Sequence, residues 1–158
     1  MNYTTVSKEI QKLAEIEGKR IFDNNQKRDR PLDQIRDNEL EINILGVMSE
    51  LAACEILSKN NRVYRRNQPE SNKSVKEPDI IVDDNITVEV KGHPKHVTYW
   101  RMNKKAFYDV KKKKADFYWM IKFTTDTDVQ YEIFTKEEVS KWETKQLQHS
   151  PVLYSNYR

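Results

Sequence analysis

The sequence predicts an α/β (α+β) fold in which helices cover a mixed β-sheet. One observation is a helical segment, residues 44–57, that is apolar nearly all round and therefore indicates a buried helix. A second is a series of short β-branched or aromatic runs after residue 60, two of them joined as a hairpin. A third is the predicted order of elements: helix, helix, three strands, helix, two strands, helix. At 158 residues, the chain has the length of one domain.

Composition limits the classes of protein to which the chain can belong. Hydrophobic residues make up 37% of the chain and charged residues 34%, with a mean hydropathy of −0.92. No apolar run approaches the ~18 residues of a membrane span, and the first residues lack the pattern of a signal peptide. The single cysteine, Cys54, excludes an internal disulfide framework and a multi-cysteine zinc site. Because no glycine-rich phosphate loop occurs either, we expect a soluble, intracellular (cytoplasmic) protein without membrane contacts or a small-molecule cofactor.

Two helices are expected before the first strand. Apolar residues recur at helical spacing from Thr5 to Phe22, which predicts an amphipathic helix. Residues 23–36 are polar and charged, and we expect a mobile connection or an arm that contacts a partner. The buried helix should begin at Asp37 or Asn38, both good N-cap residues, and run to about Ser58.

The remaining elements are short. Strands are expected over residues 62–66, 79–82, 86–91, 117–123 and 129–134. Apolar residues from Met102 to Val110 predict a helix of about three turns. Thr135 and Glu138 form a capping-box pattern, which predicts a short last helix. The single domain then consists of an N-terminal helix and charged arm (1–36), a core (37–134), and a C-terminal helix and tail (135–158).

The hairpin formed by the second and third strands carries the most informative residues. If its loop is residues 83–85, Asp79 lies opposite Glu89, because opposed residues share a face of the sheet. One face then holds apolar residues alone: Ile80, Val82, Ile86, Val88 and Val90. The other face carries Asp79, Glu89 and Lys91. A two-residue loop would mix polar and apolar residues, so we favour the three-residue loop, with Asn85 in the left-handed conformation.

Two facing carboxylates and a lysine suit metal-assisted chemistry. The carboxylates of Asp79 and Glu89 repel each other unless a positive charge lies between them. Oxygen ligands suit a hard cation, and Mg²⁺ typically takes one or two carboxylates while keeping several waters. Lys91 could orient a water molecule or neutralise charge in a phosphoryl transition state. The arrangement therefore indicates metal-assisted phosphodiester hydrolysis.

The motif by itself is short, and an alternative stays open. The pattern acid-any-Lys occurs four times, at residues 17–19, 89–91, 109–111 and 143–145, but only Glu89/Lys91 lies on a predicted strand behind a Pro-Asp. An ordinary surface hairpin with a cross-strand Glu–Lys pair would show the same pattern. Glu50 lies in the buried helix, where an unpaired carboxylate is costly, so it needs an Arg, a Lys or a metal site as its partner. This favours a functional site over an ordinary surface hairpin. Glu55, in the same helix, needs a partner for the same reason and is the competing candidate.

Three motifs together resemble a known superfamily. They are Glu50 within the helical stretch Gly46–Leu57, then Pro78-Asp79, and then Glu89-Val90-Lys91, in the order helix, strand, strand. This order resembles the PD-(D/E)XK nuclease superfamily, especially its small resolvase-like and restriction-endonuclease-like members. The resemblance covers residues 44–123 and implies a restriction-endonuclease-like core, a mixed β-sheet flanked by helices and here preceded by an N-terminal helix.

The resemblance also implies roles for the motif residues. Asp79, Glu89 and the main-chain carbonyl of Val90 would hold Mg²⁺, for which Mn²⁺ would substitute. Lys91 would serve the attacking water, and Glu50 would assist the metal directly or through water. The register of the helical motif favours Glu50 over Glu55. Gly92-His93-Pro94 departs from the family pattern, because it should end the strand directly after Lys91.

Basic residues suggest where a nucleic acid would bind, although the net charge is only +3. The candidates for nucleic-acid contacts are Arg65, Arg66, His93, Arg101, Lys104 and Lys105. His93 and His96 are expected in a loop, facing DNA or solvent, since a zinc site would need two further ligands. For the run Lys111–Lys114, we favour a solvated helix face over a phosphate-binding patch.

These observations lead us to expect a Mg²⁺-dependent DNA endonuclease of restriction type or with structure specificity. A Holliday-junction-resolvase-like enzyme is the alternative within that class. One such site cuts one strand, so we expect a homodimer. Two alternatives lie outside the class: a catalytically silent nucleic-acid-binding subunit with the same fold, and a partner-binding protein without a nucleic-acid role, which would leave the acidic hairpin unexplained.

Overall fold

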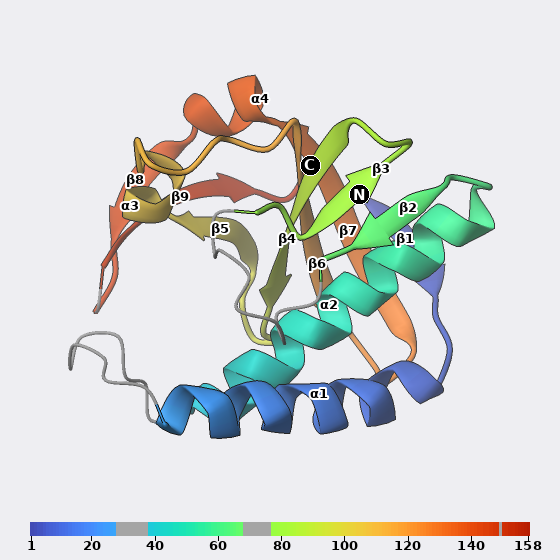
Figure 1. The fold of residues 1–158 in the computed structure, drawn as a ribbon. Coiled ribbons are helices and arrows are strands. Elements are labelled where there is room, and N and C mark those ends of the chain that lie inside the picture. Colours follow the sequence, from blue (N-terminus) through green and yellow to red (C-terminus); the bar gives the residue numbers. More distant parts are fainter. Residues whose placement is uncertain (28–37, 68–76, 149) are drawn as a thin grey trace.

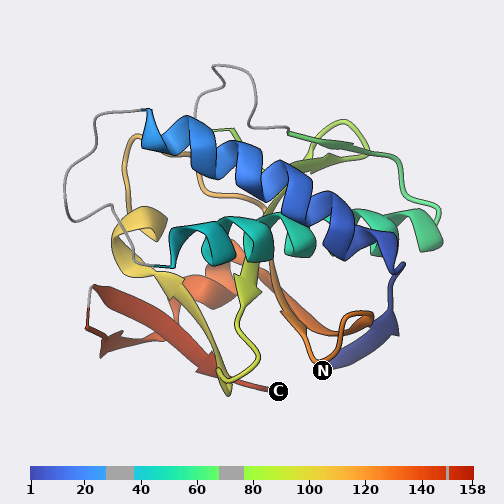
Figure 2. The same cartoon turned by 90° about the horizontal axis from the view of Figure 1, so that it is seen from below.

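The protein is described by a computed structural model that covers residues 1–27, 38–67, 77–148 and 150–158. A central β-sheet lies between a layer of two long helices and a layer that contains a smaller sheet and two short helices (Figures 1 and 2). The elements are β1 (Asn2–Thr5), α1 (Glu9–Gln26), α2 (Glu39–Lys59), β2 (Tyr64–Arg66), β3 (Ile80–Val82), β4 (Ile86–His93), β5 (Tyr99–Asn103), α3 (Lys104–Phe107), β6 (Phe117–Phe123), β7 (Asp128–Thr135), α4 (Lys136–Ser140), β8 (Glu143–Gln146) and β9 (Pro151–Asn156). None of the helices in these residues is long and apolar enough to cross a membrane.

The central sheet is mixed, as predicted. Its six strands lie in the order β1-β7-β6-β4-β3-β2, and β5, β9 and β8 form the second sheet. Within the central sheet only β4 and β6 pair in parallel; the other neighbours are antiparallel. The parallel pair requires a crossover, and the segment between β4 and β6 provides it through β5 and α3 on one face of the sheet. The helices α1 and α2 cover the opposite face (Figure 2).

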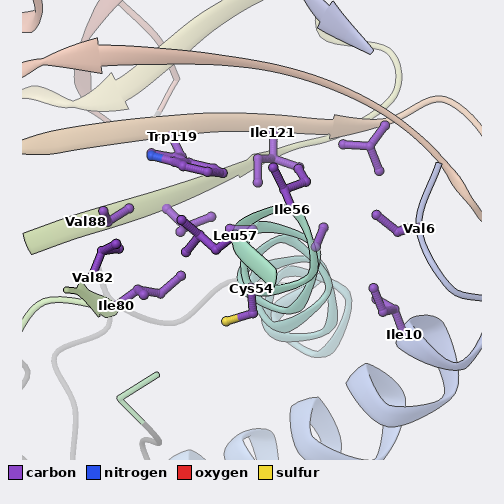
Figure 3. Close-up of a cluster of buried hydrophobic side chains, with 14 of the residues drawn as sticks. Val6, Ile10, Cys54, Ile56, Leu57, Ile80, Val82, Val88, Trp119 and Ile121 are labelled. Carbon is purple, nitrogen blue, oxygen red and sulfur yellow. The ribbon is translucent and has the colours of Figure 1, made fainter. Parts of the chain in front are cut away.

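The helix α2 is buried because it packs on both sides. Figure 3 shows Ile56 and Leu57 directed at the sheet, where they lie near Val88, Trp119 and Ile121. The other side of α2 packs against α1. There α1 comes so close that a Cβ atom on Gly18 would lie 2.7 Å from a side-chain carbon of Ile44. The prediction of a buried helix from its all-round apolar sequence is therefore confirmed.

The hairpin register is also confirmed. Val82 pairs with Ile86 and Ile80 with Val88, so the apolar residues share the face that packs on α2. The turn differs from the prediction in one respect. Asp83 and Asp84 have positive φ angles of 50° and 67°, whereas Asn85 does not take the left-handed conformation.

Several elements differ from the sequence-based expectation. A strand, β1, precedes the first helix, and that helix begins at Glu9 and extends to Gln26 rather than ending at Phe22. The beginning of the expected charged arm is thus helical. The rest of that arm, residues 28–36, and the candidate N-cap Asp37 lie outside the described residues. The buried helix has Asn38 as its N-cap residue, although its side chain makes no capping bond.

The expected helix of about three turns from Met102 to Val110 is wrong at both ends, because only Lys104–Phe107 are helical. Trp100 and Met102 are buried while their neighbours are more exposed, which is the alternation of a strand, and they belong to β5. The side chain of Asn103 accepts a hydrogen bond from the backbone N–H of Ala106, which starts the one-turn helix α3 after the strand. The predicted capping box of Thr135 and Glu138 is confirmed.

The C-terminal tail is not irregular, because it forms β8 and β9. These strands pair with β5 and complete the second sheet. A second apolar core fills the space between the two sheets and contains Trp100, Tyr118, Met120 and Phe134. Polar residues on this same face of β4 therefore lie between two layers of the protein.

Candidate functional site

The β3–β4 hairpin brings the predicted acidic residues together. Asp79 directly precedes β3, and continuing the observed register by one residue places it opposite Glu89. Its Oδ2 atom accepts a hydrogen bond from the backbone N–H of Val90, 2.8 Å away. The carboxylate of Asp79 is thus bound to the strand that carries Glu89 and Lys91.

Glu89 and Lys91 project from the same face of β4, because they are two residues apart in a strand. Glu89 is only 5% exposed. Its Oε1 atom accepts hydrogen bonds from the ammonium groups of Lys91, 3.0 Å away, and Lys112, 2.9 Å away. The predicted hairpin cluster is therefore present, with one further cation.

The charges of these residues shift one another's pKa. Burial and the charge of Glu89 raise the pKa of Asp79 to about 6, against the opposing effect of Lys91. Burial also acts to raise the pKa of Glu89, but the ammonium groups of Lys91 and Lys112 outweigh it and lower the value. For Lys91, burial acts to lower the pKa, and the carboxylates of Glu89 and Asp79 outweigh it and raise the value. Asp79 is thus the less readily ionised of the two hairpin acids.

Glu50 lies next to this cluster, on the side of α2. Its Oε2 atom accepts hydrogen bonds from Arg66, at 2.7 and 3.0 Å. Arg66 also donates two hydrogen bonds to Glu17 of α1, at 2.7 and 3.0 Å. Burial and the charge of Asp79 raise the pKa of Glu50 to about 8, and the charge of Arg66 opposes them. The partner that a buried Glu50 needs is therefore an arginine, one of the options the sequence left open.

Glu55 is held elsewhere. Both of its carboxylate oxygens accept a hydrogen bond from the backbone N–H of Ser7, at 2.9 and 3.1 Å. This contact joins the C-terminal half of α2 to the segment that precedes α1. Of the two helix carboxylates, Glu50 is therefore the one whose charge interacts with that of Asp79.

The donor set of the hairpin fits a hard divalent cation. Asp79 and Glu89 supply carboxylate oxygens, and the backbone of Val90 lies between them in contact with Asp79. Two carboxylates with waters are a common ligand set for Mg²⁺. Across the described parts of the chain, no group of three or more His, Cys, Asp or Glu side chains could hold a metal ion. A metal held here would therefore depend on two acidic side chains and on backbone or water oxygens.

The structure separates the predicted nucleic-acid-binding residues into buried and exposed ones. Arg66 is paired with two carboxylates and its side chain is 8% exposed, so it is not a surface cation. His93 belongs to β4 rather than a loop and is 1% exposed. Its ring bonds to backbone atoms of Lys91 and Arg101 at 3.0 Å, and burial lowers its pKa to about 4. The expectation of an exposed, DNA-facing His93 is therefore wrong; its ring ties β4 to β5.

The other basic candidates lie nearer the surface. Arg101 and Lys91 line a groove of about 740 Å³ between the start of α2 and the second sheet. Lys104 donates a hydrogen bond to the hydroxyl of Thr144, 2.9 Å away, while Arg65 and Lys105 are exposed. Arg101 therefore shares this groove with Lys91 of the hairpin cluster.

Sequence reasoning missed Lys112 as a member of the cluster. The run Lys111–Lys114 was interpreted as a solvated helix face, but it lies in the loop between α3 and β6. The exposure of the four lysines alternates: Lys111 and Lys113 are exposed, while Lys112 and Lys114 are partly buried.

Comparison of the chain with protein-family models, curated proteins and solved structures found no match.

Proposed function

We propose that the chain is a Mg²⁺-dependent endonuclease that hydrolyses phosphodiester bonds in DNA and has a restriction-endonuclease-like core. The observation that supports this most is the position of Asp79 across the hairpin from Glu89, with Lys91 on the same face of the strand as Glu89. Two acids that can hold a metal ion and a lysine beside them suit metal-assisted attack on a phosphate.

The role of each residue follows from its place in the cluster. Asp79, Glu89 and the carbonyl of Val90 would hold Mg²⁺, which lowers the pKa of a bound water and stabilises charge on the phosphate. Lys91 lines the groove as well as contacting Glu89, so its ammonium group can reach a water or a phosphate oxygen there. In that position Lys91 orients the attacking water and offsets negative charge that develops in the transition state.

Glu50 has a more indirect part in this proposal. Its carboxylate is paired with Arg66, so it would contact the metal through a water rather than directly. When it is ionised, above its pKa of about 8, Glu50 would place a further negative charge beside Asp79 and so add to the electrostatic attraction for a divalent cation. Arg66 in turn holds Glu50 in place.

A second candidate function is a catalytically silent nucleic-acid-binding subunit with the same fold. One observation favours it: each acid of the cluster already has a partner within the chain. Glu50 is paired with Arg66, Glu89 with Lys91 and Lys112, and Asp79 with the Val90 amide. These partners keep the acids hydrogen-bonded when no metal is bound, as a subunit that only binds nucleic acid would require.

Nicking of a supercoiled plasmid separates the two functions. Strand breaks are expected with Mg²⁺ or Mn²⁺ and should be lost in Asp79→Asn, which removes the charge but can keep the bond to Val90. Asp84→Asn is the matched control, because Asp84 is an exposed aspartate at the tip of the same hairpin. Equal breaks in both variants would reject a role for Asp79. DNA binding without breaks on plasmid, linear duplex and four-way junction would favour the silent subunit.

The substrate and the oligomer need separate measurements. A defined pattern of cuts on linear duplex would indicate a restriction-type enzyme, and preferential cleavage of a four-way junction would indicate a resolvase-like one. We expect a homodimer in either case, because one cluster of this kind cuts one strand. Sedimentation equilibrium at the concentration used for cleavage tests that expectation.

A further inference from the structure

The loop between α3 and β6 contributes a lysine to the candidate site. The ammonium group of Lys112 lies 2.9 Å from Oε1 of Glu89, slightly closer than that of Lys91 at 3.0 Å. The side chain of Lys112 is 28% exposed, whereas Lys111 and Lys113 on either side are exposed residues. Lys112 is thus distinguished from its neighbours by a buried carboxylate partner, 23 residues away in sequence.

Neighbouring contacts hold the loop in this position. The ammonium group of Lys114 lies over the ring of Phe107, 5.2 Å from its centre. The backbone N–H of Ala115 donates a hydrogen bond to the hydroxyl of Tyr118, 3.2 Å away. The carboxylate of Asp116 accepts a bond from the backbone N–H of Thr87, 2.9 Å away. The path of the loop is thus fixed by these contacts and by the backbone N–H of Lys112, which donates to the carbonyl of Asp109, 3.1 Å away. None of them involves the side chain of Lys112, so we expect its contact with Glu89 to be lost without release of the loop.

The charges of the two hairpin acids, taken without Glu50 and Arg66, are balanced only because of Lys112. Asp79 and Glu89 carry two negative charges, and Lys91 and Lys112 carry two positive charges. Both ammonium groups contact the same oxygen, Oε1, and no donor from the described residues contacts Oε2. A divalent cation bound to Glu89 would therefore raise the total charge to about +2 and repel Lys112.

We propose that Lys112 is an exchangeable cation of this site: it neutralises Glu89 before a divalent cation binds, and then turns to a phosphate oxygen of the substrate. This inference rests on the proposed function. A divalent cation held by Asp79 and Glu89 would repel Lys112, and its ammonium group would then find a negatively charged partner in the phosphodiester. Lys91 is then free to act on water, because phosphate binding is taken over by the second lysine.

Removal of Lys112 should change ion binding and cleavage in opposite directions. Lys112→Met keeps the length of the side chain and removes its charge, so Mn²⁺ should bind roughly tenfold more tightly, as measured by water-proton relaxation. Cleavage of plasmid at saturating Mn²⁺ should nevertheless slow by about tenfold or more, since a phosphate partner is lost. Lys112→Arg keeps the charge and should bind Mn²⁺ as the wild type does. Lys113→Met is the matched surface control and should leave both quantities unchanged.

Any other result would contradict one identifiable part of the proposal. If Lys112→Met binds Mn²⁺ no more tightly than Lys113→Met, with both variants folded by circular dichroism, Lys112 does not compete with the ion. Tighter binding with undiminished cleavage would overturn the transfer to phosphate. If the wild type binds Mn²⁺ no better than Asp79→Asn does, the proposed metal site fails, and this inference fails with it. The Asp79→Asn measurement thus distinguishes the two failures.

Discussion

The carboxylate of Asp79 accepts a hydrogen bond from the backbone N–H of Val90, with the oxygen and nitrogen 2.8 Å apart. This bond holds the residue ahead of β3 against the strand that carries Glu89. It brings two carboxylates together, and the cations nearby are bound to Glu89 rather than to Asp79. Holding the two carboxylates this close therefore lowers the free energy of unfolding of the metal-free protein, as is common for functional sites.

Because the ionised carboxylate of Asp79 is unfavourable in the fold, replacing it with a neutral side chain should stabilise the metal-free protein. The pKa of Asp79 is about 6 in the folded protein and 3.8 ordinarily, so the folded state holds this proton more tightly. The contribution of Asp79 to stability therefore falls as pH rises from about 4 to about 6 and stays low above that range. Without metal at pH 8, Asp79→Asn should raise the free energy of unfolding by about 1 to 3 kcal/mol. Below pH 4 the difference should vanish. Urea unfolding at both pH values measures it, and a less stable variant at pH 8 would contradict the prediction.

Arg66 and Arg65 are adjacent in β2 but should differ sharply on substitution. Arg66→Ala leaves the buried carboxylates of Glu17 and Glu50 without their partner, which should cost about 3 kcal/mol. Arg65 is exposed, and Arg65→Ala should change the free energy of unfolding by less than about 0.5 kcal/mol. Urea unfolding of the two variants at neutral pH compares them directly. Similar losses for both would argue against the buried ion network.

Gly92 and Gly46 provide a second matched pair. A Cβ atom on Gly92 would lie 2.4 Å from the hydroxyl of Ser49 and 3.1 Å from the backbone oxygen of Leu45. Gly92→Ala should therefore destabilise the protein by about 1 to 3 kcal/mol. Among the described residues, and apart from the backbone of α2 itself, no atom lies within 4 Å of the corresponding position on Gly46, so Gly46→Ala should stabilise the protein by about 0.5 to 1 kcal/mol. Thermal unfolding gives the sign of each change; destabilisation by both would contradict the packing described.

Arg101 should contribute to DNA binding if the groove beside Lys91 receives the phosphate backbone. Arg101→Ala is then expected to lower affinity for duplex DNA and to reduce the slope of log affinity against log salt by about 1. Lys8→Ala is the control, because Lys8 lies at the start of α1, near the end of α2 that is remote from the groove. Fluorescence anisotropy over a series of salt concentrations gives both slopes. An unchanged slope in Arg101→Ala would remove the groove from the DNA-binding surface.

The hairpin and the buried helix were predicted correctly because each is specified by the order of apolar and polar residues within one short segment. The hairpin register followed from alternation, because only one register separates apolar from polar residues. The buried helix followed from its apolar circumference. By contrast, the second sheet depends on pairing between β5 and the distant β9, and the short strands β5 and β8 at its edges leave only a weak pattern.

The same distinction applies to the candidate site. Asp79, Glu89 and Lys91 were brought together by one hairpin, so the sequence predicted their proximity. The contact of Lys112 with Glu89 depends on the path of the crossover between two parallel strands, which no local pattern specifies. His93 was misjudged because Pro94 suggested a loop, whereas pairing with β6 carries β4 through His93.

The two outer strands of the central sheet bear on how copies of the protein meet. One edge is β1, four residues long, and the other is β2, three residues long and ending in two arginines. Short and charged edge strands offer little backbone to which another chain could add a strand. The sheet is thereby protected from edge-to-edge aggregation. A homodimer of this protein is therefore not expected to form by extension of the central sheet from one subunit into the other.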